Sequence, residues 1–576
     1  MKMVSIKVNG IDLEVEKGTS MLDAAKKLNI NIPTLCNMYM ADGNTRNCKG
    51  TCRVCLVEVE GWKRLAPSCA TEVKSGMSIK TNSIKAIKAR RTITELLLSN
   101  HSKDCLNCDR NTNCELQKLA ADLGINDDRY EGERVNFDLD ISDGFIRDRD
   151  KCILCRRCVT TCNEVQKVHA ITVADRGFGT NISTFSNDPI KDTNCTYCGQ
   201  CVAVCPTGAL REKSDYKDIW RVLDDSNKYV VAQIAPAVRS ALAEEFGLQS
   251  GELSTGKIVS ALKMLSFDEV FDTNFAADLT IMEEANEFIE RFTLGENLPL
   301  ITSCCPAWVN YAENNYSDNM NFVSSCKSPQ QMFGAIAKNY LPQELSIKRD
   351  DLFVVSIMPC IAKKFEANRQ EMISNEGIKD VDLVITTREL AKIIKEGGID
   401  IKSLPDAEFD NPLGVSSGAG SLFGTSGGVM EAALRTSYEW ITGKTLEKID
   451  FENVRGLEGL KEATISLNGR DINVAVVSSL GNAKKIMDEI KNGKSKYHFI
   501  EVMACPGGCI DGGGQPFIKS DREILKRRMN AIYNEDKNKK IRKAHENPMI
   551  DKLYKEYLQK PNSYIAHHIL HVNYKK

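Results

Sequence analysis

Four cysteines in the second half of the chain constrain its fold more than any other feature. Cys305, Cys360, Cys505 and Cys509 span 205 residues and occur in the segments TSCCPAW, SIMPCIAKKFE and EVMACPGGCIDGGGQP. Ferredoxin ligands come in compact runs, whereas these cysteines lie in separate loops that follow apolar runs. We therefore expect a single metal site that a whole domain assembles from distant segments.

The length and the cysteine content bound the class of protein. A chain of 576 residues is too long for one core and predicts about three to five domains. The opening MKMVSIKVNGIDLEVEKG alternates like a strand, unlike a signal peptide, and no run of about 18 apolar residues predicts a membrane helix. We expect a soluble cytoplasmic protein without membrane or nucleic-acid partners, in which the 22 cysteines bind metal.

Residues 1–80 have the pattern of a small iron-sulfur domain. Two alternating strands, VSIKVNG and DLEVEKG, precede the helical segment SMLDAAKKLNI. The segment TCRVCLVEVEG places a CxxC pair on a loop entering a strand, where two thiolates can bind one iron. This pattern resembles the β-grasp 2Fe-2S domain of plant-type ferredoxins and of the large iron-sulfur subunit of complex I. The resemblance implies 2Fe-2S ligands at Cys36, Cys52, Cys55 and Cys69.

Cys48 is a rival ligand in this domain. Fifteen residues separate Cys36 from Cys52, where relatives have about ten or eleven, and Cys48 falls at the usual distance. Only Cys52 forms a CxxC pair with Cys55 before LVEVEG. We therefore predict that Cys48 is not a ligand.

A second cluster motif lies in the segment HSKDCLNCDRNTNC. Its histidine alone would be a packing or surface residue, and its three cysteines alone could bind zinc. The spacing H-x3-C-x2-C-x5-C resembles the 4Fe-4S motif of the same complex I subunit and of the iron-iron hydrogenases. The resemblance implies a small 4Fe-4S domain at 81–125, in which an imidazole ligand raises the cluster potential. Its ligands would be His101, Cys105, Cys108 and Cys114.

Residues 140–212 carry the strongest motif by spacing alone. The pattern C-x2-C-x2-C-x3-C occurs twice, and Pro206 follows the second copy. A zinc ribbon would instead use two separated pairs. In two-cluster ferredoxins the fourth cysteine of each run ligates the other cluster. One 4Fe-4S cluster therefore takes Cys152, Cys155, Cys158 and Cys205, and the other takes Cys162, Cys195, Cys198 and Cys201.

The segment NSIKAIKARRTITELLLSN predicts a helix between the first two cluster motifs. Near its start it carries Lys85, Lys88, Arg90 and Arg91. The ordinary interpretation is a solvated helix face. The alternative is a docking patch for an acidic ferredoxin, since opposite charge raises encounter rates.

From residue 213 onward, strand-like runs repeatedly break into a loop and then a helix. The clearest examples are YVVAQIAPAVRSALAEEF, PLITSCCPAWVNYAE, LFVVSIMPCIAKKFEA and VAVVSSLGNAKKIMDEI. This alternation predicts parallel α/β lobes that present side chains beyond the carboxyl ends of their strands. The loops with the four separated cysteines fall at such positions and could close over one cluster between two lobes.

These loops resemble the signature segments of the iron-iron hydrogenases, and the resemblance covers essentially the full chain. In that family four cysteines hold the H-cluster, a 4Fe-4S cluster joined to a two-iron unit with carbon monoxide, cyanide and azadithiolate ligands. The match assigns Cys305, Cys360, Cys505 and Cys509 to it, with Cys509 as the bridging cysteine. The implied fold is α/β and multi-domain: a β-grasp 2Fe-2S domain at 1–80, a 4Fe-4S domain with one His and three Cys ligands at 81–125, a two-cluster ferredoxin-like domain at 140–212, and a large two-lobed α/β H-cluster domain at 213–576.

Further residues match the surroundings of the two-iron unit in that family. Lys363 of MPCIAKK matches a lysine that pairs with a cyanide, where a buried ammonium offsets ligand charge. Two of the matching residues are methionines, Met358 and Met503, and taken alone they would be interpreted as residues that fill the hydrophobic core. The segment GVSSGAGSLFGTSGGVMEAAL lacks the GKS or GKT ending of a phosphate loop and is expected to pack closely around the cofactor. The other matches are Pro236, Pro329, Gln330, Met358 and Met503.

A proton route is expected beside the electron route. Cys304 matches the thiol that exchanges protons with the bridging amine of the dithiolate, and a thiol suits this because its reference pKa is about 8.5. Glu284, Glu287 and Arg291 share one face of a predicted helix and alone would be a solvated stripe. With Ser324 they match the relay from Cys304 to the surface in the family. Cys326 is an extra thiol without an assigned role.

The resemblance implies an enzyme, a ferredoxin hydrogenase catalysing 2H⁺ + 2e⁻ ⇌ H₂ with a relay of one 2Fe-2S and three 4Fe-4S clusters. A ferredoxin is the expected electron partner, and maturation enzymes would build the H-cluster. Two alternatives stay open: an electron-transfer subunit of a larger NAD(P)-linked complex, and a hydrogenase-like iron-sulfur assembly protein. Neither explains Cys304 and Lys363. Because no glycine motif for nucleotide binding is convincing, NAD(P) would need partner subunits.

Overall fold

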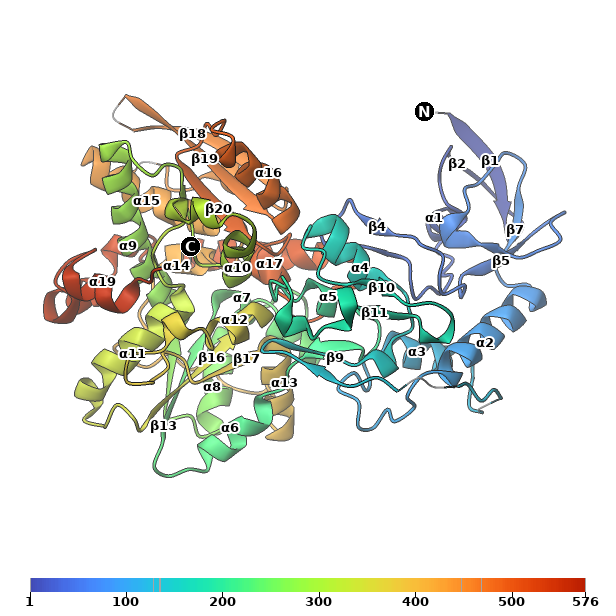
Figure 1. The fold of residues 1–576 in the computed structure, drawn as a ribbon, viewed down its shortest axis with the longest axis horizontal. Coiled ribbons are helices and arrows are strands. Elements are labelled where there is room, and N and C mark those ends of the chain that lie inside the picture. Colours follow the sequence, from blue (N-terminus) through green and yellow to red (C-terminus); the bar gives the residue numbers. More distant parts are fainter. Residues whose placement is uncertain (1, 128, 134–135, 447, 468, 575–576) are drawn as a thin grey trace.

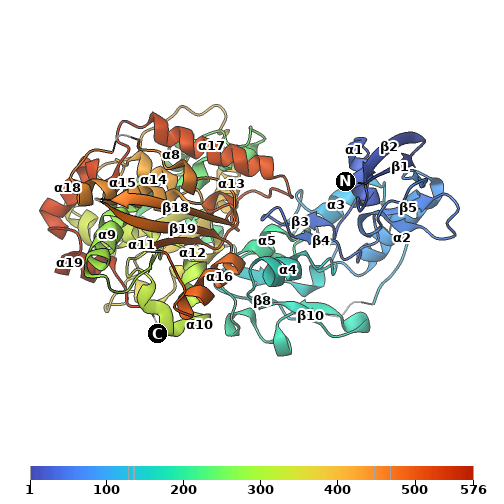
Figure 2. The same ribbon diagram turned by 90° about the horizontal axis from the view of Figure 1, so that it is seen from above.

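The computed structural model describes residues 2–127, 129–133, 136–446, 448–467 and 469–574. Figure 1 shows a large body, formed by the second half of the chain, and a narrower arm formed by the cysteine-rich first part. In the view from above in Figure 2, the N-terminal sheet again lies at the end of the arm farthest from the body. The expected iron-sulfur segments thus extend outward from the domain that carries the four separated cysteines.

A mixed five-stranded sheet, with the order β2-β1-β7-β5-β6, forms the end of the arm. Strand β1 pairs antiparallel with β2 and parallel with β7. Helix α1 (Met21–Lys27) begins after Ser20, whose hydroxyl accepts the backbone N–H of Asp23. The two strands and the helix predicted at the start of the chain are therefore confirmed. The strands of this sheet are β1 Met3–Val8, β2 Ile11–Glu16, β5 Leu56–Val59, β6 Ala66–Pro67 and β7 Ser78–Lys80; β3 Met38–Tyr39 and β4 Arg46–Asn47 pair separately as an antiparallel ladder.

Helix α2 (Ile84–Ser99) follows this sheet, as predicted, and begins after the capping residue Ser83. Lys85, Lys88 and Arg91 are exposed on it. The expectation of a solvated face or a docking patch was wrong for Arg90, which is only 7% exposed. Its side of the helix packs against β5, so the guanidinium lies inside the domain.

The rest of the arm has little regular structure. A three-stranded sheet, with the order β12-β9-β8, and the hairpin β10-β11 frame the paired cysteine runs. The short helices α4 and α5 contain the third cysteines of the two runs, Cys158 and Cys201. The elements are α3 Glu115–Asp122, β8 Asp140–Ile141, β9 Phe145–Arg147, α4 Arg157–Thr160, β10 Thr172–Ala174, β11 Asn181–Ser183, α5 Gln200–Ala203 and β12 Leu210–Glu212.

Two four-stranded sheets organise the body. The first has the order β14-β13-β16-β17 and is parallel throughout. The second has the order β15-β20-β19-β18, and only its edge strand β18 is antiparallel. The predicted parallel lobes are confirmed apart from that edge. The strands are β13 Tyr229–Ile234, β14 Glu269–Asp272, β15 Leu300–Ile301, β16 Leu352–Met358, β17 Leu383–Thr386, β18 Leu460–Leu467, β19 Arg470–Ser478 and β20 Phe499–Met503.

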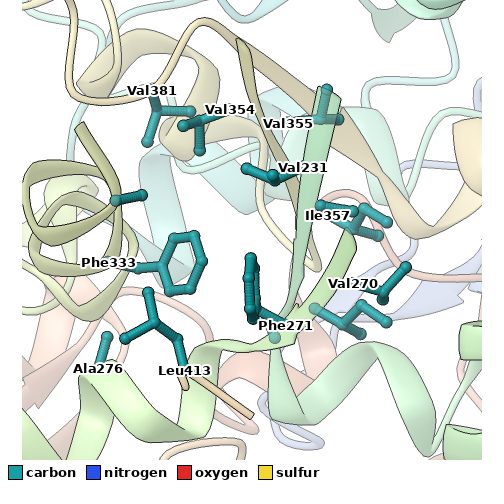
Figure 3. Close-up of a cluster of buried hydrophobic side chains, with 14 of the residues drawn as sticks. Val231, Val270, Phe271, Ala276, Phe333, Val354, Val355, Ile357, Val381 and Leu413 are labelled. Carbon is teal, nitrogen blue, oxygen red and sulfur yellow. The ribbon is translucent and has the colours of Figure 1, made fainter. Parts of the chain in front are cut away.

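The first sheet is the centre of the largest hydrophobic core, as Figure 3 shows. Val231 of β13 and Val354 of β16 are fully buried between helices on the two faces. Phe333 packs against Phe271 with ring centroids 5.8 Å apart. Each such side chain contributes about 1.5–3 kcal/mol on burial. A sheet covered on both faces explains why these strands read as continuous apolar runs.

Helices surround both sheets and carry much of the site. The longest, α9, is buried over most of its length, where it packs against α11, α14 and α15. The helices of the body are α6 Tyr216–Leu223, α7 Pro236–Arg239, α8 Thr255–Met264, α9 Thr273–Leu294, α10 Pro306–Asn315, α11 Pro329–Leu345, α12 Ile361–Glu366, α13 Thr387–Glu396, α14 Gly418–Leu422, α15 Gly428–Thr442, α16 Leu480–Lys491, α17 Arg522–Asn538, α18 Pro548–Leu553 and α19 Tyr564–Leu570.

Buried side-chain amides join the arm to the body. The Gln166 amide donates to the Ala504 carbonyl oxygen and accepts from the Leu480 N–H, both at 2.9 Å. Gln200 donates to the Asp511 carbonyl oxygen, also at 2.9 Å. Both glutamines are almost inaccessible to solvent. The paired cysteine runs are therefore fixed to the loop that follows β20.

Candidate active site and iron-sulfur sites

The four separated cysteines lie where strands of the two sheets end. Cys360 follows β16 and caps α12, and Cys305 caps α10 soon after β15. Cys505 and Cys509 lie in the loop after β20. Proline occupies the first position of α10, directly after Cys305, where its missing N–H is not needed and its fixed φ suits the start of a helix. The arrangement expected from the strand-loop-helix pattern is thus present.

These cysteines line one cavity between the two lobes. The cavity also brings together the predicted residues Pro236, Pro329, Gln330, Met358, Lys363 and Met503, with Cys304 beside Cys305. Its remaining walls are almost entirely apolar. They comprise Ala235, Ala237, Thr273, Ala277, Pro306, Pro359, Phe423, Ala504, Gly508 and Gly512.

The chemistry of this cavity fits a large thiolate-bound cofactor. Burial raises the pKa of Cys305, Cys360, Cys505 and Cys509, so free thiolates there would be costly without a metal. Metal binding deprotonates cysteine ligands outright. The carbonyl oxygen of the Gln330 side chain lacks a hydrogen-bond partner among the described residues. A polar ligand on the bound group could supply one.

Lys363 is the cation that faces the cavity. Its Nζ donates to the Cys304 carbonyl oxygen at 3.2 Å and to Glu366 Oε2 at 2.9 Å. The same Glu366 oxygen accepts from Ser328 and Gln330, so three groups fix this carboxylate. Burial acts to lower the pKa of Lys363, but Glu366 outweighs it and the pKa is raised. The side chain is therefore a permanent ammonium at neutral pH.

A line of polar groups leads from Cys304 to the surface. Ser324 Oγ donates to Glu287 Oε2 at 2.7 Å, and Arg291 donates to Glu287 Oε1 at 2.5 Å. Glu284 lies one helical turn earlier on α9 and is fully buried. Arg291 is part-exposed and forms the outer end. Of the five residues of the expected relay, Cys304 lines the cavity, Glu284 is close enough to act on it electrostatically, and Ser324, Glu287 and Arg291 are joined by hydrogen bonds.

The two inner groups of this route, Glu284 and Cys304, have raised pKa values that favour their neutral, protonated forms. Burial raises the pKa of Glu284 to about 8, and the Glu287 carboxylate adds to the shift. Burial likewise raises the pKa of Cys304 well above its usual range. At pH 7 both groups hold a proton, so Glu284 can donate to a deprotonated neighbour. Cys326 lies outside this cavity, with its sulfur 3.9 Å from Glu287 Oε2 and from His571 Nδ1.

The glycine-rich segment packs closely, as the sequence predicted. A side chain at Gly420 would collide with the Asn274 carbonyl oxygen at 2.5 Å. Gly508 has a φ of +77° and would meet the Ser426 nitrogen at 2.5 Å. Glu501 accepts the backbone N–H groups of Gly427 and of Met430 at 2.7 Å. These contacts bring Phe423 of the segment to the cavity wall.

Two cavity features were missed from the sequence. Glu366 orders Lys363 and Gln330, although nothing marked it except its place in MPCIAKKFE. Thr273 and Ala277 line the cavity from α9, a helix without a cysteine. An acid three residues after a lysine on one helix could have indicated the ion pair. The wall residues gave no signal, because apolar side chains beside a cavity look like any other core.

The eight cysteines of the paired runs separate into two groups in space. Cys152, Cys155, Cys158 and Cys205 line one cavity, which is the first set expected from the exchanged fourth ligand. In the second set, burial raises the pKa of Cys201 well above its usual range, and the charges of Cys162, Cys195 and Cys198 add to the shift. Burial also raises the pKa of Cys505, with Cys198 among the further causes. The second set therefore lies toward the large cavity of the body.

The 2Fe-2S candidates also come together. The pKa of Cys36 is lowered by contacts with the Cys52 and Cys69 thiols, and contact with Cys69 lowers the pKa of Cys55 to about 6. All four are buried, whereas Cys48 is exposed. Farther along, His101 follows α2, Cys105 and Cys108 lie in the next loop, and Cys114 caps α3. The charge of Cys108 acts on Cys114, so these two thiols are neighbours.

Replacing Cys48 by serine is expected to leave the 2Fe-2S resonance spectrum of the reduced protein unchanged. Replacing Cys52 by serine is expected to alter or abolish that signal, because Cys52 belongs to the buried group. Electron paramagnetic resonance of both variants checks the pair. A lost signal in Cys48→Ser with a normal one in Cys52→Ser would reverse the ligand assignment.

Known proteins match the chain over its whole length. Residues 228–513 match the iron only hydrogenase large subunit, C-terminal domain, and residues 522–576 match the iron hydrogenase small subunit. Residues 1–83 match a 2Fe-2S iron-sulfur cluster binding domain. Residues 90–129 match the NADH-ubiquinone oxidoreductase-G iron-sulfur binding region, and residues 151–209 match a 4Fe-4S dicluster domain.

NADP-reducing hydrogenase subunit HndD of Solidesulfovibrio fructosivorans is 50% identical, covering 100% of this chain and 99% of that protein. Iron hydrogenase 1 of Clostridium pasteurianum is 41% identical, covering 100% of both. The chain belongs to the iron-iron hydrogenase family. A solved structure of a variant of FeFe-hydrogenase HydA1 from Chlamydomonas reinhardtii is 43% identical with a TM-score of 0.56, and covers 63% of this chain and 99% of that one.

The iron-iron hydrogenase is of the clostridial, multi-cluster type, because its H-cluster domain follows a 2Fe-2S domain, a 4Fe-4S region and a 4Fe-4S dicluster domain. It therefore catalyses hydrogen oxidation or production at an H-cluster, with the iron-sulfur domains as its relay. In the part of the chain that the structure describes, every helix is too short or too polar to span a bilayer.

Proposed function

We propose that this hydrogenase interconverts protons, electrons and hydrogen, 2H⁺ + 2e⁻ ⇌ H₂, at an H-cluster in the cavity between the two lobes. The observation that carries the proposal is the meeting of four thiols from separate loops with one lysine in an apolar cavity. When bound, the H-cluster supplies the redox-active irons on which hydrogen is formed or split. Its ligands would be Cys305, Cys360, Cys505 and Cys509, with Cys509 bridging to the two-iron unit.

The other cavity residues bind and shield the cofactor. Lys363 would hold an anionic cyanide ligand against its ammonium, which Glu366 keeps in place at 2.9 Å. The Gln330 amide would offer polar contact beside it. Apolar walls exclude water and strengthen these charge interactions. The walls include Pro236, Pro329, Met358 and Met503.

Protons would travel along α9 between the cavity and the surface. Cys304 would hold a transferable proton at its thiol beside the bound cofactor, and Glu284 would hold one at its buried carboxyl group. Ser324 is hydrogen-bonded to Glu287, which is paired with Arg291 at the outer end. A raised pKa of about 8 suits Glu284 to this work, because the group can both lose and regain a proton near neutral pH.

The arm would hold one 2Fe-2S and three 4Fe-4S clusters, which would supply the electron relay. The proposed domains are 1–80 for the 2Fe-2S cluster, 81–125 for the cluster with one His and three Cys ligands, 140–212 for the paired clusters and 213–576 for the H-cluster. Asn47 donates to the carbonyl oxygens of Cys36 and Cys155, at 2.6 and 3.0 Å, so the first and third domains adjoin. Proximity of Cys198 to Cys505 supports the second paired cluster as the last step.

A ferredoxin is the proposed external carrier. A second candidate is a complex that exchanges electrons with NADP through partner subunits, which the full-length likeness to HndD favours. Purification from the host with identification of co-purifying chains separates the two. Hydrogen evolution by the isolated chain with reduced ferredoxin supports the first. Activity with NADPH only in the presence of other chains supports the second.

Infrared spectroscopy tests the active site directly. Protein matured by the family's enzymes is expected to hold about 20 irons per chain and to show carbon monoxide and cyanide bands. Protein made without those enzymes is expected to hold about 18 or fewer, with no bands and no activity. Active protein that lacks the bands would exclude the proposed H-cluster.

A further inference from the structure

Two buried arginines in the arm differ from all the others that the structure describes. Eight arginines are less than 9% exposed, and six of them form an ion pair with a carboxylate. Arg90 and Arg110 form none within the described ranges, and the side-chain hydrogen bonds they make there go to backbone carbonyl oxygens. A buried charge without a partner is strongly unfavourable. A guanidinium cannot escape this cost by losing its proton, so each needs a source of negative charge nearby.

Arg110 lies at the junction of two expected cluster sites. It occupies the loop between Cys108 and Cys114 and donates to the Cys205 carbonyl oxygen at 3.0 Å. A Cβ atom added at Gly208 would lie 2.9 Å from the Cys108 sulfur and 3.6 Å from Arg110 Cγ. Cys108, Gly208 and Arg110 are therefore close neighbours. The guanidinium therefore sits where the histidine-containing site adjoins the first of the paired sites.

The Phe517 ring closes the other side of Arg110. Its centroid lies 3.8 Å from the guanidinium carbon of Arg110 and 4.4 Å from that of Arg388. Arg388 is different, because Glu212 neutralises it at 2.8 Å. A ring face offers a cation only a partial charge. Phe517 fixes the position of Arg110 without balancing its charge.

Arg90 is likewise a buried arginine without an ion pair to a carboxylate, and it lies beside the expected 2Fe-2S site. It donates to the carbonyl oxygens of Leu56 and Thr81, at 2.9 and 2.8 Å, and Leu56 directly follows Cys55. Burial lowers the pKa of Arg90, and charge on Cys55 opposes that shift. Burial also lowers the pKa of Arg110; charge on Cys205, Glu212 and Cys114 opposes that shift, and the charge of Arg388 adds to it. At Arg90 the nearby anion is a cluster cysteine, and at Arg110 cluster cysteines act together with Glu212, which Arg388 already pairs.

We propose that Arg90 and Arg110 are counter-cations of the electron relay, each raising the reduction potential of the clusters it adjoins. The inference rests on the proposed relay clusters. One electron added to a cluster makes it more negative by one charge, and a fixed adjacent cation stabilises that form. Net charge near a cluster is one of the quantities that set its potential. No proton or other reactant is needed in this step.

Potentiometric titration of matured, full-length protein, followed by electron paramagnetic resonance, tests the proposal. Arg110→Gln is expected to lower the reduction equilibrium constant of an adjoining 4Fe-4S cluster at least tenfold, about 59 mV for one electron. The 2Fe-2S potential is expected to stay unchanged. Arg90→Gln is expected to show the opposite selectivity. The matched control is Arg91→Gln, which removes the same charge from an exposed position on α2.

Rescue by lysine separates charge from shape. Arg110→Lys is expected to keep the potential near that of the natural protein, because the positive charge remains. If Arg110→Gln does not take up iron, Arg110→Met carries the same test with a different neutral side chain. Equal shifts in the lysine and neutral variants, or no shift in the neutral ones, would overturn the proposal. Missing cluster signals in the unsubstituted protein would instead refute the proposed relay itself.

Discussion

Replacing Cys304 by alanine is expected to lower hydrogen turnover by a factor on the order of 10² or more, the scale of a lost general acid-base group. The metal ligands are untouched, so iron content and the carbon monoxide and cyanide bands should stay as in the unsubstituted protein. Cys304 is the buried thiol between the cavity and Glu284, and alanine offers no exchangeable proton there. Steady-state hydrogen production with an artificial reductant measures the loss.

Two neighbouring substitutions make this test specific. Cys304→Asp is expected to recover part of the turnover, since a carboxyl group still carries a proton. Cys305→Ala is expected to lose or distort the 4Fe-4S part of the site, because the adjacent sulfur is a proposed ligand. Loss of iron in Cys304→Ala, or turnover at the unsubstituted rate, would show that the roles of the two cysteines are assigned wrongly.

Replacing Lys363 by methionine is expected to abolish hydrogen turnover and to destabilise the protein. Without the ammonium, Glu366 is left as a buried charge 3% exposed, and breaking such a pair costs about 3–5 kcal/mol. The cavity also loses the cation proposed to hold a cyanide ligand. Denaturant unfolding gives the stability, and infrared bands report the two-iron unit.

The double variant Lys363→Met with Glu366→Gln separates these two effects. It removes both charges, so most of the lost stability is expected to return. The carbon monoxide and cyanide bands and the activity are expected to stay absent, because the cation is still missing. Recovery of activity together with stability would mean that Lys363 acts only by neutralising Glu366.

The sequence predicted the strand-loop-helix order of the body well because each unit is locally determined. The run LFVVSIMPCIAKKFEA becomes β16 and α12 with Cys360 between them, since a strand buried on both faces must be continuously apolar. The antiparallel edge strand β18 could not be predicted in the same way. A different local signal marks it: only two residues, an Asn-Gly pair in the sequence, separate it from β19, and so short a connection permits antiparallel pairing alone.

The cavity was predictable where a chemically unusual residue marks it. Cysteines, Lys363 and the acids of α9 stand out in their segments, whereas Thr273 and Ala277 contribute only shape. Arg90 was misplaced for a related reason. Its neighbours on the helix are exposed lysines and arginines, and only the packing of α2 on β5 turns one of them inward.

The amide of Gln166 bears on whether such enzymes can be assembled from interchangeable parts. The side-chain N–H of Gln166 donates to the carbonyl oxygen of Ala504, which is next to Cys505, and its side-chain oxygen accepts from the Leu480 N–H. A foreign ferredoxin module grafted before residue 213 would leave that carbonyl and the Leu480 N–H without partners unless it brought an equivalent amide. A graft would therefore have to preserve these two hydrogen bonds. The arm is a separate unit in the sequence, but its buried contacts make it part of the same packed structure as the body.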